Sequence, residues 1–235
     1  MEDIFFTNKV ILVAEIGHNF NGDIKLAKKM ILQAKKCGAD IAKFQLYDID
    51  TIKKPEDSHY QELKDSQLTR EQLKELAREC KRIGIEFMAS AFDITRVGWL
   101  EEVGVKRHKI ASRSIFNEEL IDNMLMTGKP IIASLGKWDK KRFPGFKADF
   151  LYCVSIYPTK DEDLDDFPQK FSKYAGFSDH TIGTKWAKLA IDRGARIIEK
   201  HFTLDKNMFG CDQAGSAEPQ ELKNICEYDK LKTIK

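Results

Sequence analysis

The chain has 235 residues, 42% of them hydrophobic, and a formal net charge of +2 with acidic and basic residues interspersed. This length suits one α/β barrel or one open α/β domain with a full core, and we expect a single domain over residues 1–235. Because charges of both signs are interspersed, the sequence predicts no basic face of the kind that binds nucleic acid.

The longest apolar runs are far shorter than the roughly 20 residues of a membrane span, so no membrane association is expected. Glu2 and Asp3 interrupt the region where a signal peptide would be apolar. The five cysteines are scattered and form no Cys-x-x-Cys pair, which indicates reduced thiols. We therefore expect a cytoplasmic protein.

Five apolar-periodic segments end in glycine and lead within three residues into a β-branched or apolar run. The glycines are Gly38, Gly84, Gly104, Gly128 and Gly194. Glycine after a helix adopts the left-handed conformation with little steric penalty. Each of the five is therefore predicted to join a helix to a strand.

The apolar pattern predicts eight strands, and helices with one apolar face lie between most of them. The strands are predicted near Val10–Ala14, Ile41–Gln45, Ile85–Ala89, Arg107–Ala111, Ile131–Ala133, Phe150–Cys153, Tyr174–Phe177 and Arg196–Lys200. Thr69 and Gln72 predict a capping box, and Asn117 predicts the cap of another helix. The last helix is expected from Pro219 to about Leu231.

Eight β/α units in this length favour a (β/α)8 TIM barrel, although periodicity alone does not exclude a doubly wound open sheet. Residues 134–150 carry no helical apolar stripe, so we expect a shortened or missing fifth helix. Residues 48–66 are expected to form a polar loop after the second strand.

Each predicted strand delivers a polar side chain at its carboxyl end, where parallel α/β folds place their sites. These residues are Glu15, Lys43, Gln45, Ser90, Lys109, Ser112, Ser134, Tyr157, Ser178, His180, Glu199 and His201. Serine is also common in βα turns as a helix cap, and a lone histidine is most often structural. A lysine on a central parallel strand, however, is buried away from solvent, so its charged ammonium needs a partner. Such a lysine therefore indicates a functional role.

Two lysines and several hydroxyls suit a phosphate or a phosphorylated carboxylate. His180 and His201, on neighbouring strand ends, suit a divalent ion that polarises a carbonyl oxygen. The combination indicates a condensation between phosphoenolpyruvate and an aldehyde or ketone. Cys211 is interpreted as a loop residue, because no histidine is placed in the sequence to activate it. His59 and His108 are interpreted as surface or structural residues.

Several motifs resemble the N-acetylneuraminate (sialic acid) synthase family, in the order in which that family carries them. They are Ala14-Glu15-Ile16-Gly17, Asn21-Gly22, Gly38-Ala39-Asp40, Lys43-Phe44-Gln45, Lys109-Ile110-Ala111-Ser112, Tyr157-Pro158-Thr159, Ser178-Asp179-His180-Thr181-Ile182-Gly183 and Glu199-Lys200-His201-Phe202-Thr203. The resemblance covers most of the chain from Val10 to Leu222.

The resemblance implies a barrel that condenses phosphoenolpyruvate with an open-chain N-acetylhexosamine, giving a nine-carbon 2-keto acid and phosphate. It implies that His180 and His201 bind a divalent metal, Mn²⁺ in most of the family, with Mg²⁺ or Co²⁺ as alternatives. Phosphoenolpyruvate would contact Lys43, Ser90, Lys109, Ser112, Ser134 and Ser178. The sugar would contact Glu15, Tyr157 and Asp212, with Gln45 also in the substrate site.

The chain departs from the family pattern at several positions. Phe20 replaces a histidine, and a histidine stands instead at position 18. The family's carboxy-terminal antifreeze-like domain is not in the sequence, so we expect an altered sugar site, with a homodimer or a separately encoded antifreeze-like domain as alternatives. Two other functions remain open. One is a Schiff-base aldolase using Lys43, Lys109 or Lys200, and the other is a non-catalytic or weakly active barrel that binds phosphoenolpyruvate or sugar.

Overall fold

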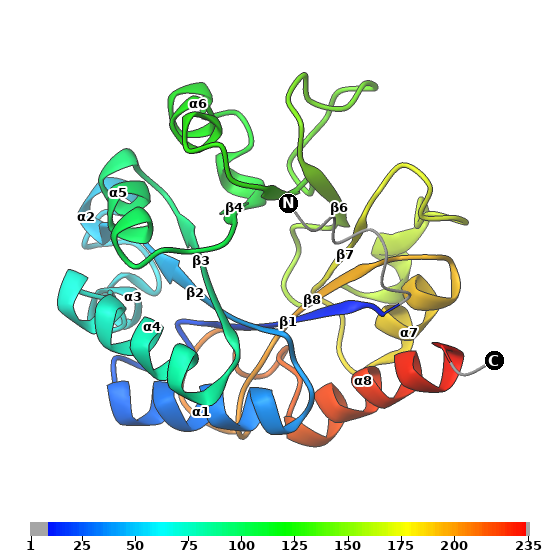
Figure 1. Ribbon diagram of the computed structural model, residues 1–235, viewed down its shortest axis with the longest axis horizontal. Coiled ribbons are helices and arrows are strands. Elements are labelled where there is room, and N and C mark those ends of the chain that lie inside the picture. Colours follow the sequence, from blue (N-terminus) through cyan, green and yellow to red (C-terminus); the bar gives the residue numbers. More distant parts are fainter. Residues whose placement is uncertain (1–8, 234–235) are drawn as a thin grey trace.

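The structure is a computed structural model that describes residues 9–233, and its strands form one closed parallel barrel (Figure 1). Each strand pairs with the next along the chain, and the eighth pairs with the first. The strands are β1 (Ile11–Gly17), β2 (Ile41–Leu46), β3 (Glu86–Ala91), β4 (His108–Ile110), β5 (Ile131–Ser134), β6 (Asp149–Cys153), β7 (Gly176–Asp179) and β8 (Ile197–His201). This order confirms the predicted (β/α)8 barrel over the open sheet.

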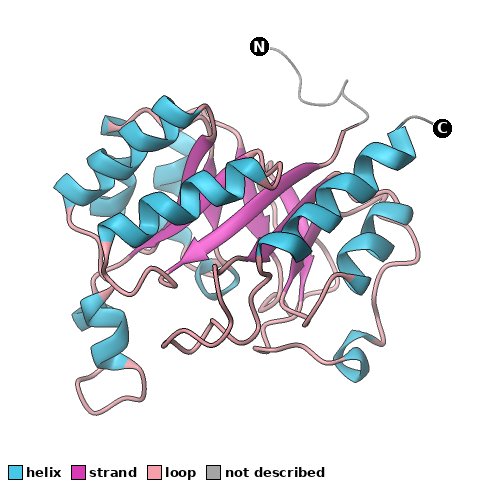
Figure 2. Cartoon of the chain, turned by 90° about the horizontal axis from the view of Figure 1, so that it is seen from below, coloured by secondary structure: helices cyan, strands magenta, loops and turns pink. Residues whose placement is uncertain are grey.

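Helices cover the outside of the barrel, and loops gather at the end toward which the strands point (Figure 2). The α-helices are α1 (Ile24–Lys36), α2 (Ile49–Ile52), α3 (Tyr60–Asp65), α4 (Arg70–Ile83), α5 (Ile94–Glu102), α6 (Glu118–Met126), α7 (Lys185–Asp192) and α8 (Pro219–Thr233). Two short 3-10 helices, η2 (Ser112–Ser114) and η3 (Asp161–Leu164), follow β4 and β6. No helix within residues 9–233 is long and apolar enough to cross a bilayer.

The residues predicted to begin and end helices do so in the structure. Thr69 and Gln72 form the capping box of α4, and the Asn117 side chain accepts a hydrogen bond from Leu120 N at the start of α6. All five glycines at the helix ends have positive φ angles. Glycine is required at position 38 for two reasons. Its φ angle is positive, and an added Cβ would lie 2.3 Å from Cys226 Sγ on α8.

The predicted loss of the fifth helix is confirmed, since β5 leads to β6 through residues that form no helix. Aromatic side chains of this loop pack on the barrel instead. Phe143 and Phe146 lie 5.3 and 5.6 Å from the ring of Phe150 on β6, and Phe143 also lies 5.0 Å from Tyr174. In Figure 1 this side of the barrel, between α6 and α7, is covered mainly by loops.

Two expectations about the connections were wrong. Residues 48–66 are not a plain polar loop, because they form α2 and α3, with the Asp48 side chain capping α2. The sequence singled out only the fifth unit as irregular, but the sixth unit also lacks an α-helix and holds only η3 between β6 and β7. Helical segments as short as these leave little periodicity in the sequence, which explains both errors.

The barrel has two apolar layers. One fills its interior and comprises Val13, Ile41, Met88, Ile132, Leu151, Ala175 and Ile197. The larger layer lies between the strands and the surrounding helices. The interior is therefore packed over the amino-terminal part of the strands, and polar groups begin only at the carboxyl ends.

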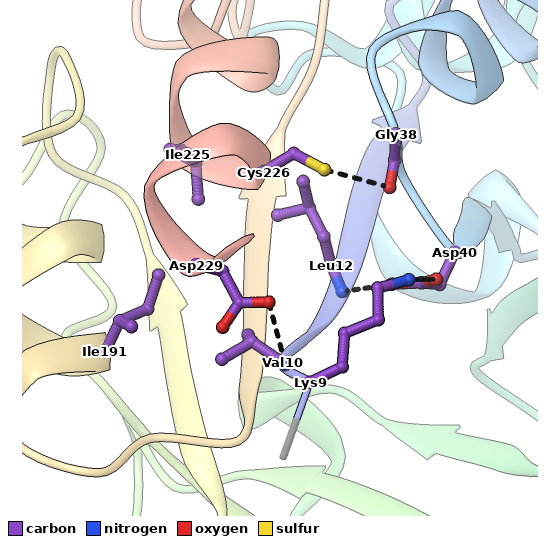
Figure 3. Close-up of a pocket in the computed structure, with 9 residues that line it drawn as sticks. All are labelled: Lys9, Val10, Leu12, Gly38, Asp40, Ile191, Ile225, Cys226 and Asp229. Carbon is purple, nitrogen blue, oxygen red and sulfur yellow. Dashed lines mark hydrogen bonds and ion pairs between the residues drawn. The ribbon is translucent and has the colours of Figure 1, made fainter. Parts of the chain in front are cut away.

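Near the amino-terminal end of the strands, α8 packs on the outside of the barrel beside β1 (Figure 3). Val10 N donates to Asp229 Oδ2 at 3.1 Å, and Leu12 N donates to Asp40 Oδ2 at 3.0 Å. Cys226 on α8 also contacts the carbonyl oxygen of Gly38. These contacts fasten the last helix to the first strand and leave the opposite end for chemistry.

Candidate active site

The first part of the site is a buried ion pair between neighbouring strands. Glu15 on β1 faces Lys43 on β2 in register, and Glu15 Oε2 lies 2.8 Å from Lys43 Nζ. Gln45 Nε2 donates to the other Glu15 oxygen at 3.0 Å, and Lys43 Nζ lies 3.4 Å from Ser90 Oγ on β3. Four predicted site residues are thus brought together by the register of three strands.

The second part is built around Lys109 on β4. Its Nζ donates to Ser134 Oγ on β5 at 2.6 Å and lies 3.4 Å from Glu199 Oε1 on β8. The same Glu199 oxygen accepts from Ser178 Oγ at 2.9 Å, while Oε2 lies 3.5 Å from Lys43 Nζ. Glu199 therefore joins the two lysines across the barrel.

Glu199 lies near the carboxyl end of its strand, as predicted, but the sequence indicated no catalytic or binding role for it. It precedes His201 by two positions, so both side chains lie on the same side of β8. That spacing was the available signal, because His201 had already been placed at the site.

The two lysines have different electrostatic environments. Burial disfavours the Lys43 charge, but the carboxylates of Glu15 and Glu199 outweigh it and raise the pKa of Lys43. Burial lowers the pKa of Lys109, and Glu199 offsets this only in part. Burial also disfavours the charge of Glu199, yet Lys109 and Lys43 prevail and lower its pKa. The pocket thus holds one firmly protonated ammonium and one that is easier to deprotonate.

His180 and His201 converge at the mouth of the barrel, with ring centroids 5.6 Å apart. His180 Nδ1 lies 2.7 Å from the Val154 carbonyl oxygen, which leaves its Nε2 available. The Tyr157 ring packs on His180 at 4.1 Å and meets His201 edge-on at 5.8 Å. A small pocket between these rings also includes Asp212.

The histidine pair fits a divalent ion. A backbone carbonyl that holds one ring nitrogen is the usual support of a histidine ligand. Burial lowers the pKa of His201 and so favours the neutral ring that binds metals, and His201 Nδ1 is buried without a hydrogen bond, 3.4 Å from Asp212 Oδ2. At His180 burial is outweighed by Cys153 and the Val154 carbonyl, which raise the pKa, so a cation there would compete with a proton.

Ser112 lies at the edge of the site. Its Oγ accepts from Gly136 N at 3.1 Å and lies 3.4 Å from Cys153 Sγ. No hydrogen bond joins it to either site lysine within the described residues. The structure therefore brings Ser90, Ser134 and Ser178 closer to the charged groups than Ser112.

The expectation that no histidine lies near Cys211 is wrong. His18, which is far away in sequence, places its Nε2 3.4 Å from Cys211 Sγ. Burial, Asp212 and Glu62 nevertheless raise the pKa of Cys211 to about 12, so the sulfur is a thiol and a poor nucleophile. Only packing of the loop after β8 on the turn after β1 brings the two residues together.

The remaining sequence candidates lie outside the site. Phe20 is buried in the core, 5.9 Å from the Phe44 ring. Lys200 Nζ is buried in an ion pair with Asp179 at 2.9 Å. His59 is half exposed, and His108 is buried beside Glu101, as surface and structural roles require.

The closed barrel, with two lysines, carboxylates and paired histidines at its carboxyl end, defines an enzyme of the (β/α)8 class. Residues 30–233 match the profile of the NeuB family. The chain belongs to the NeuB family, which confirms the resemblance to sialic acid synthases.

Named relatives agree with this assignment. The chain is 34% identical to the N,N'-diacetyllegionaminic acid synthase of Legionella pneumophila, covering 92% of this chain and 70% of the relative. It is 31% identical to human N-acetylneuraminate-9-phosphate synthase, covering 94% and 69%. The crystal structure of N-acetylneuraminic acid synthetase from Leptospira borgpetersenii superposes with a TM-score of 0.85 at 30% identity, covering 96% of this chain and 84% of that one.

Proposed function

We propose that this chain condenses phosphoenolpyruvate with an open-chain N-acetylhexosamine, N-acetylmannosamine or a modified relative, to give a nine-carbon 2-keto acid and phosphate. The observation that carries the proposal is the pair of buried lysines, Lys43 and Lys109, which approach Glu199 from opposite sides. The family supports the reaction class, since named relatives make nonulosonic acids.

The lysines and serines would hold the phosphate and carboxylate groups of phosphoenolpyruvate. Each ammonium already lies beside a hydroxyl, Lys43 beside Ser90 and Lys109 beside Ser134, so each supplies a donor pair to an anion. Because these groups are buried, their charges act in a low dielectric and need little reorganisation when the anion enters. An anion would then replace Glu199 as the partner of Lys109.

In this mechanism the methylene carbon of phosphoenolpyruvate attacks the carbonyl carbon of the sugar, and positive charge develops at the former enol carbon. Glu15 and Glu199, which flank Lys43, would lie near that charge and would stabilise it. Water adds at this carbon and passes one proton to the alkoxide that the sugar carbonyl has become. The C–O bond to phosphate then breaks as the second proton is lost, which leaves the keto group and free phosphate. Glu15, fixed by Lys43 and Gln45, is the proposed group that holds the sugar or moves a proton.

His180 and His201 would hold a divalent ion, most naturally Mn²⁺, which would supply Lewis-acid polarisation of the sugar carbonyl. Tyr157 keeps the two rings in place, and Asp212 lies beside His201. These two residues are therefore proposed to orient the sugar next to the ion.

The test is phosphate release from phosphoenolpyruvate with Mn²⁺, screened over N-acetylmannosamine and its deoxy, diamino and phosphorylated relatives. The expected result is phosphate release that depends on one acceptor, with a nine-carbon 2-keto acid found by mass spectrometry. Binding of phosphoenolpyruvate without any product across the panel would favour the non-catalytic alternative.

A Schiff-base aldolase is the second candidate, because the lowered pKa of Lys109 is the property that a nucleophilic lysine needs. Borohydride reduction in the presence of substrate would trap a covalent adduct on Lys109 if this candidate is correct. Turnover that is lost with a chelator and leaves no such adduct would exclude it.

A further inference from the structure

Three side chains at the barrel mouth turn nitrogen, sulfur and oxygen atoms toward one another. His18 Nε2 lies 3.4 Å from Cys211 Sγ and 3.7 Å from Asp212 Oδ2, and the ligand atoms of all three residues lie within 4.8 Å of one another. A tetrahedral zinc ion with ordinary bond lengths holds its ligand atoms roughly 3.3–3.6 Å apart. The group is therefore close to the size of a zinc site.

The charges at this place favour a cation. Glu62 Oε1 also lies 3.6 Å from His18 Nε2, so two carboxylates flank the imidazole. Among residues 9–233, no lysine or arginine forms an ion pair with Glu62 or Asp212; the ion-pair partners of these two carboxylates are His18, His59 and His201. A divalent ion would supply the positive charge that the two carboxylates lack.

The group is also held in position by its surroundings. His18 is only 6% exposed, and its Nδ1 makes no hydrogen bond, so all its polar contacts lie on the Nε2 side. Cys211 N donates to Glu62 Oε1 at 2.7 Å. Gln213 Nε2 donates to the Asn19 carbonyl oxygen at 2.9 Å and fastens the loop after β8 to the turn after β1.

We propose that His18, Cys211 and Asp212 form a second divalent-cation site, distinct from the His180–His201 pair and suited to zinc. Binding of the ion would displace the thiol proton of Cys211, and imidazole and thiolate ligands favour zinc over Mg²⁺ or Mn²⁺. Glu62 is the additional oxygen ligand. The ion would link the turn after β1, the loop after β8 and α3, and would thereby stabilise the mouth of the barrel.

Asp212 stands between this site and the histidine pair, because the same Oδ2 atom lies 3.4 Å from His201 Nδ1. A competing arrangement uses His59, Glu62 and Cys211, whose ligand atoms also lie within 4.8 Å of one another. His59 is exposed, whereas His18 is buried and aimed into the group, so the structure favours His18.

Co²⁺ and Zn²⁺ titrations of the full chain test the proposal without any measurement of turnover. A cobalt ion bound to Cys211 gives a thiolate-to-metal charge-transfer absorption, which histidines and carboxylates do not produce. We expect this band in the wild type, and we expect Cys211→Ala to abolish it. We also expect His18→Gln to weaken zinc binding at least by the roughly 10–100-fold that loss of a supporting residue alone produces.

Two matched variants serve as controls. Cys153→Ala removes the thiol that lies 3.9 Å from His180 Nδ1, and His59→Gln removes the competing histidine. Both are expected to retain the band, and Zn²⁺ is expected to raise the melting temperature of the wild type but not of Cys211→Ala.

The proposal would be overturned by a wild type without the band, by a band that survives Cys211→Ala, or by a band lost in Cys153→Ala. Loss of the band in His59→Gln but not in His18→Gln would equally reject the assignment to His18. The His180→Ala/His201→Ala double variant is expected to keep the band, and its disappearance there would mean one shared site.

Discussion

The substitution Glu199→Gln removes the carboxylate that lies between two buried lysines. Its oxygens are 3.4 Å from Lys109 Nζ and 3.5 Å from Lys43 Nζ. At these distances each attraction is worth about 5 kcal/mol at an effective dielectric constant of about 20, before desolvation is subtracted. Removing one partner of a buried pair typically costs about 3–5 kcal/mol, and we expect the free energy of unfolding to fall by that amount.

Urea unfolding at neutral pH measures this loss, with Glu162→Gln as the matched control. Glu162 makes a single exposed ion pair with Lys160, so its substitution should change the free energy of unfolding by less than about 0.5 kcal/mol. A loss below about 1 kcal/mol in Glu199→Gln, or an equal loss in the control, would refute the electrostatic account of the site.

The pH dependence of this effect has a definite sign. The lysines lower the pKa of Glu199 in the folded chain, so its stabilisation is fully present above the pKa of an unfolded glutamate, about 4.3. It is lost as the pH falls through the lower, folded value. The stability difference between wild type and Glu199→Gln should therefore be constant near neutrality and shrink in acid, and a difference that grows in acid would contradict the assignment.

Three further outcomes are expected. Lys43→Ala should lower the rate of phosphate release by about 10²–10³-fold, as loss of a transition-state donor does. The control Lys185→Ala, at an exposed lysine, should not change this rate. A loss below about tenfold in Lys43→Ala would exclude the anion-binding role of Lys43. Excess chelator should abolish turnover and Mn²⁺ should restore it, whereas full activity in chelator would exclude the metal. Gly38→Ala should lower the free energy of unfolding by about 2–5 kcal/mol, because left-handed strain and the clash with Cys226 add. Gly84→Ala, with a similar φ angle and open space around its Cβ, should lose only about 1–2 kcal/mol, and equal losses would refute the packing argument.

Much of the fold could be predicted because its signals are local. Glycines end the helices, the cap residues Thr69 and Asn117 begin two of them, and apolar periodicity marks the long segments. The helices α2 and α3 were missed because each is shorter than two turns and depends on contacts such as the Lys64–Asp50 ion pair. The sixth unit was misjudged because η3 leaves no period to detect.

The positions of those candidate residues that lie at strand ends could be predicted from the sequence. Lys43, Lys109, His180 and His201 lie on or directly after parallel strands, so alternation along each strand sufficed to place them. Contacts made by loops were not predictable. His18 meets Cys211 across 193 positions of sequence, and only the folded loop after β8 brings them together.

The loop that replaces the fifth helix covers β6 with aromatic rings and not with a helix face. Phe143 and Phe146 cover Phe150 through ring contacts. The packing on this side of the barrel therefore depends on these rings more than on the length of the loop that carries them. Extra residues in the loop should be tolerated, while loss of a ring would let water reach the inner strands. The strand that these rings cover, β6, pairs with β5, and β5 carries Ser134, the hydrogen-bond partner of Lys109. A surface loop thereby shields a strand whose neighbour in the sheet positions a buried lysine.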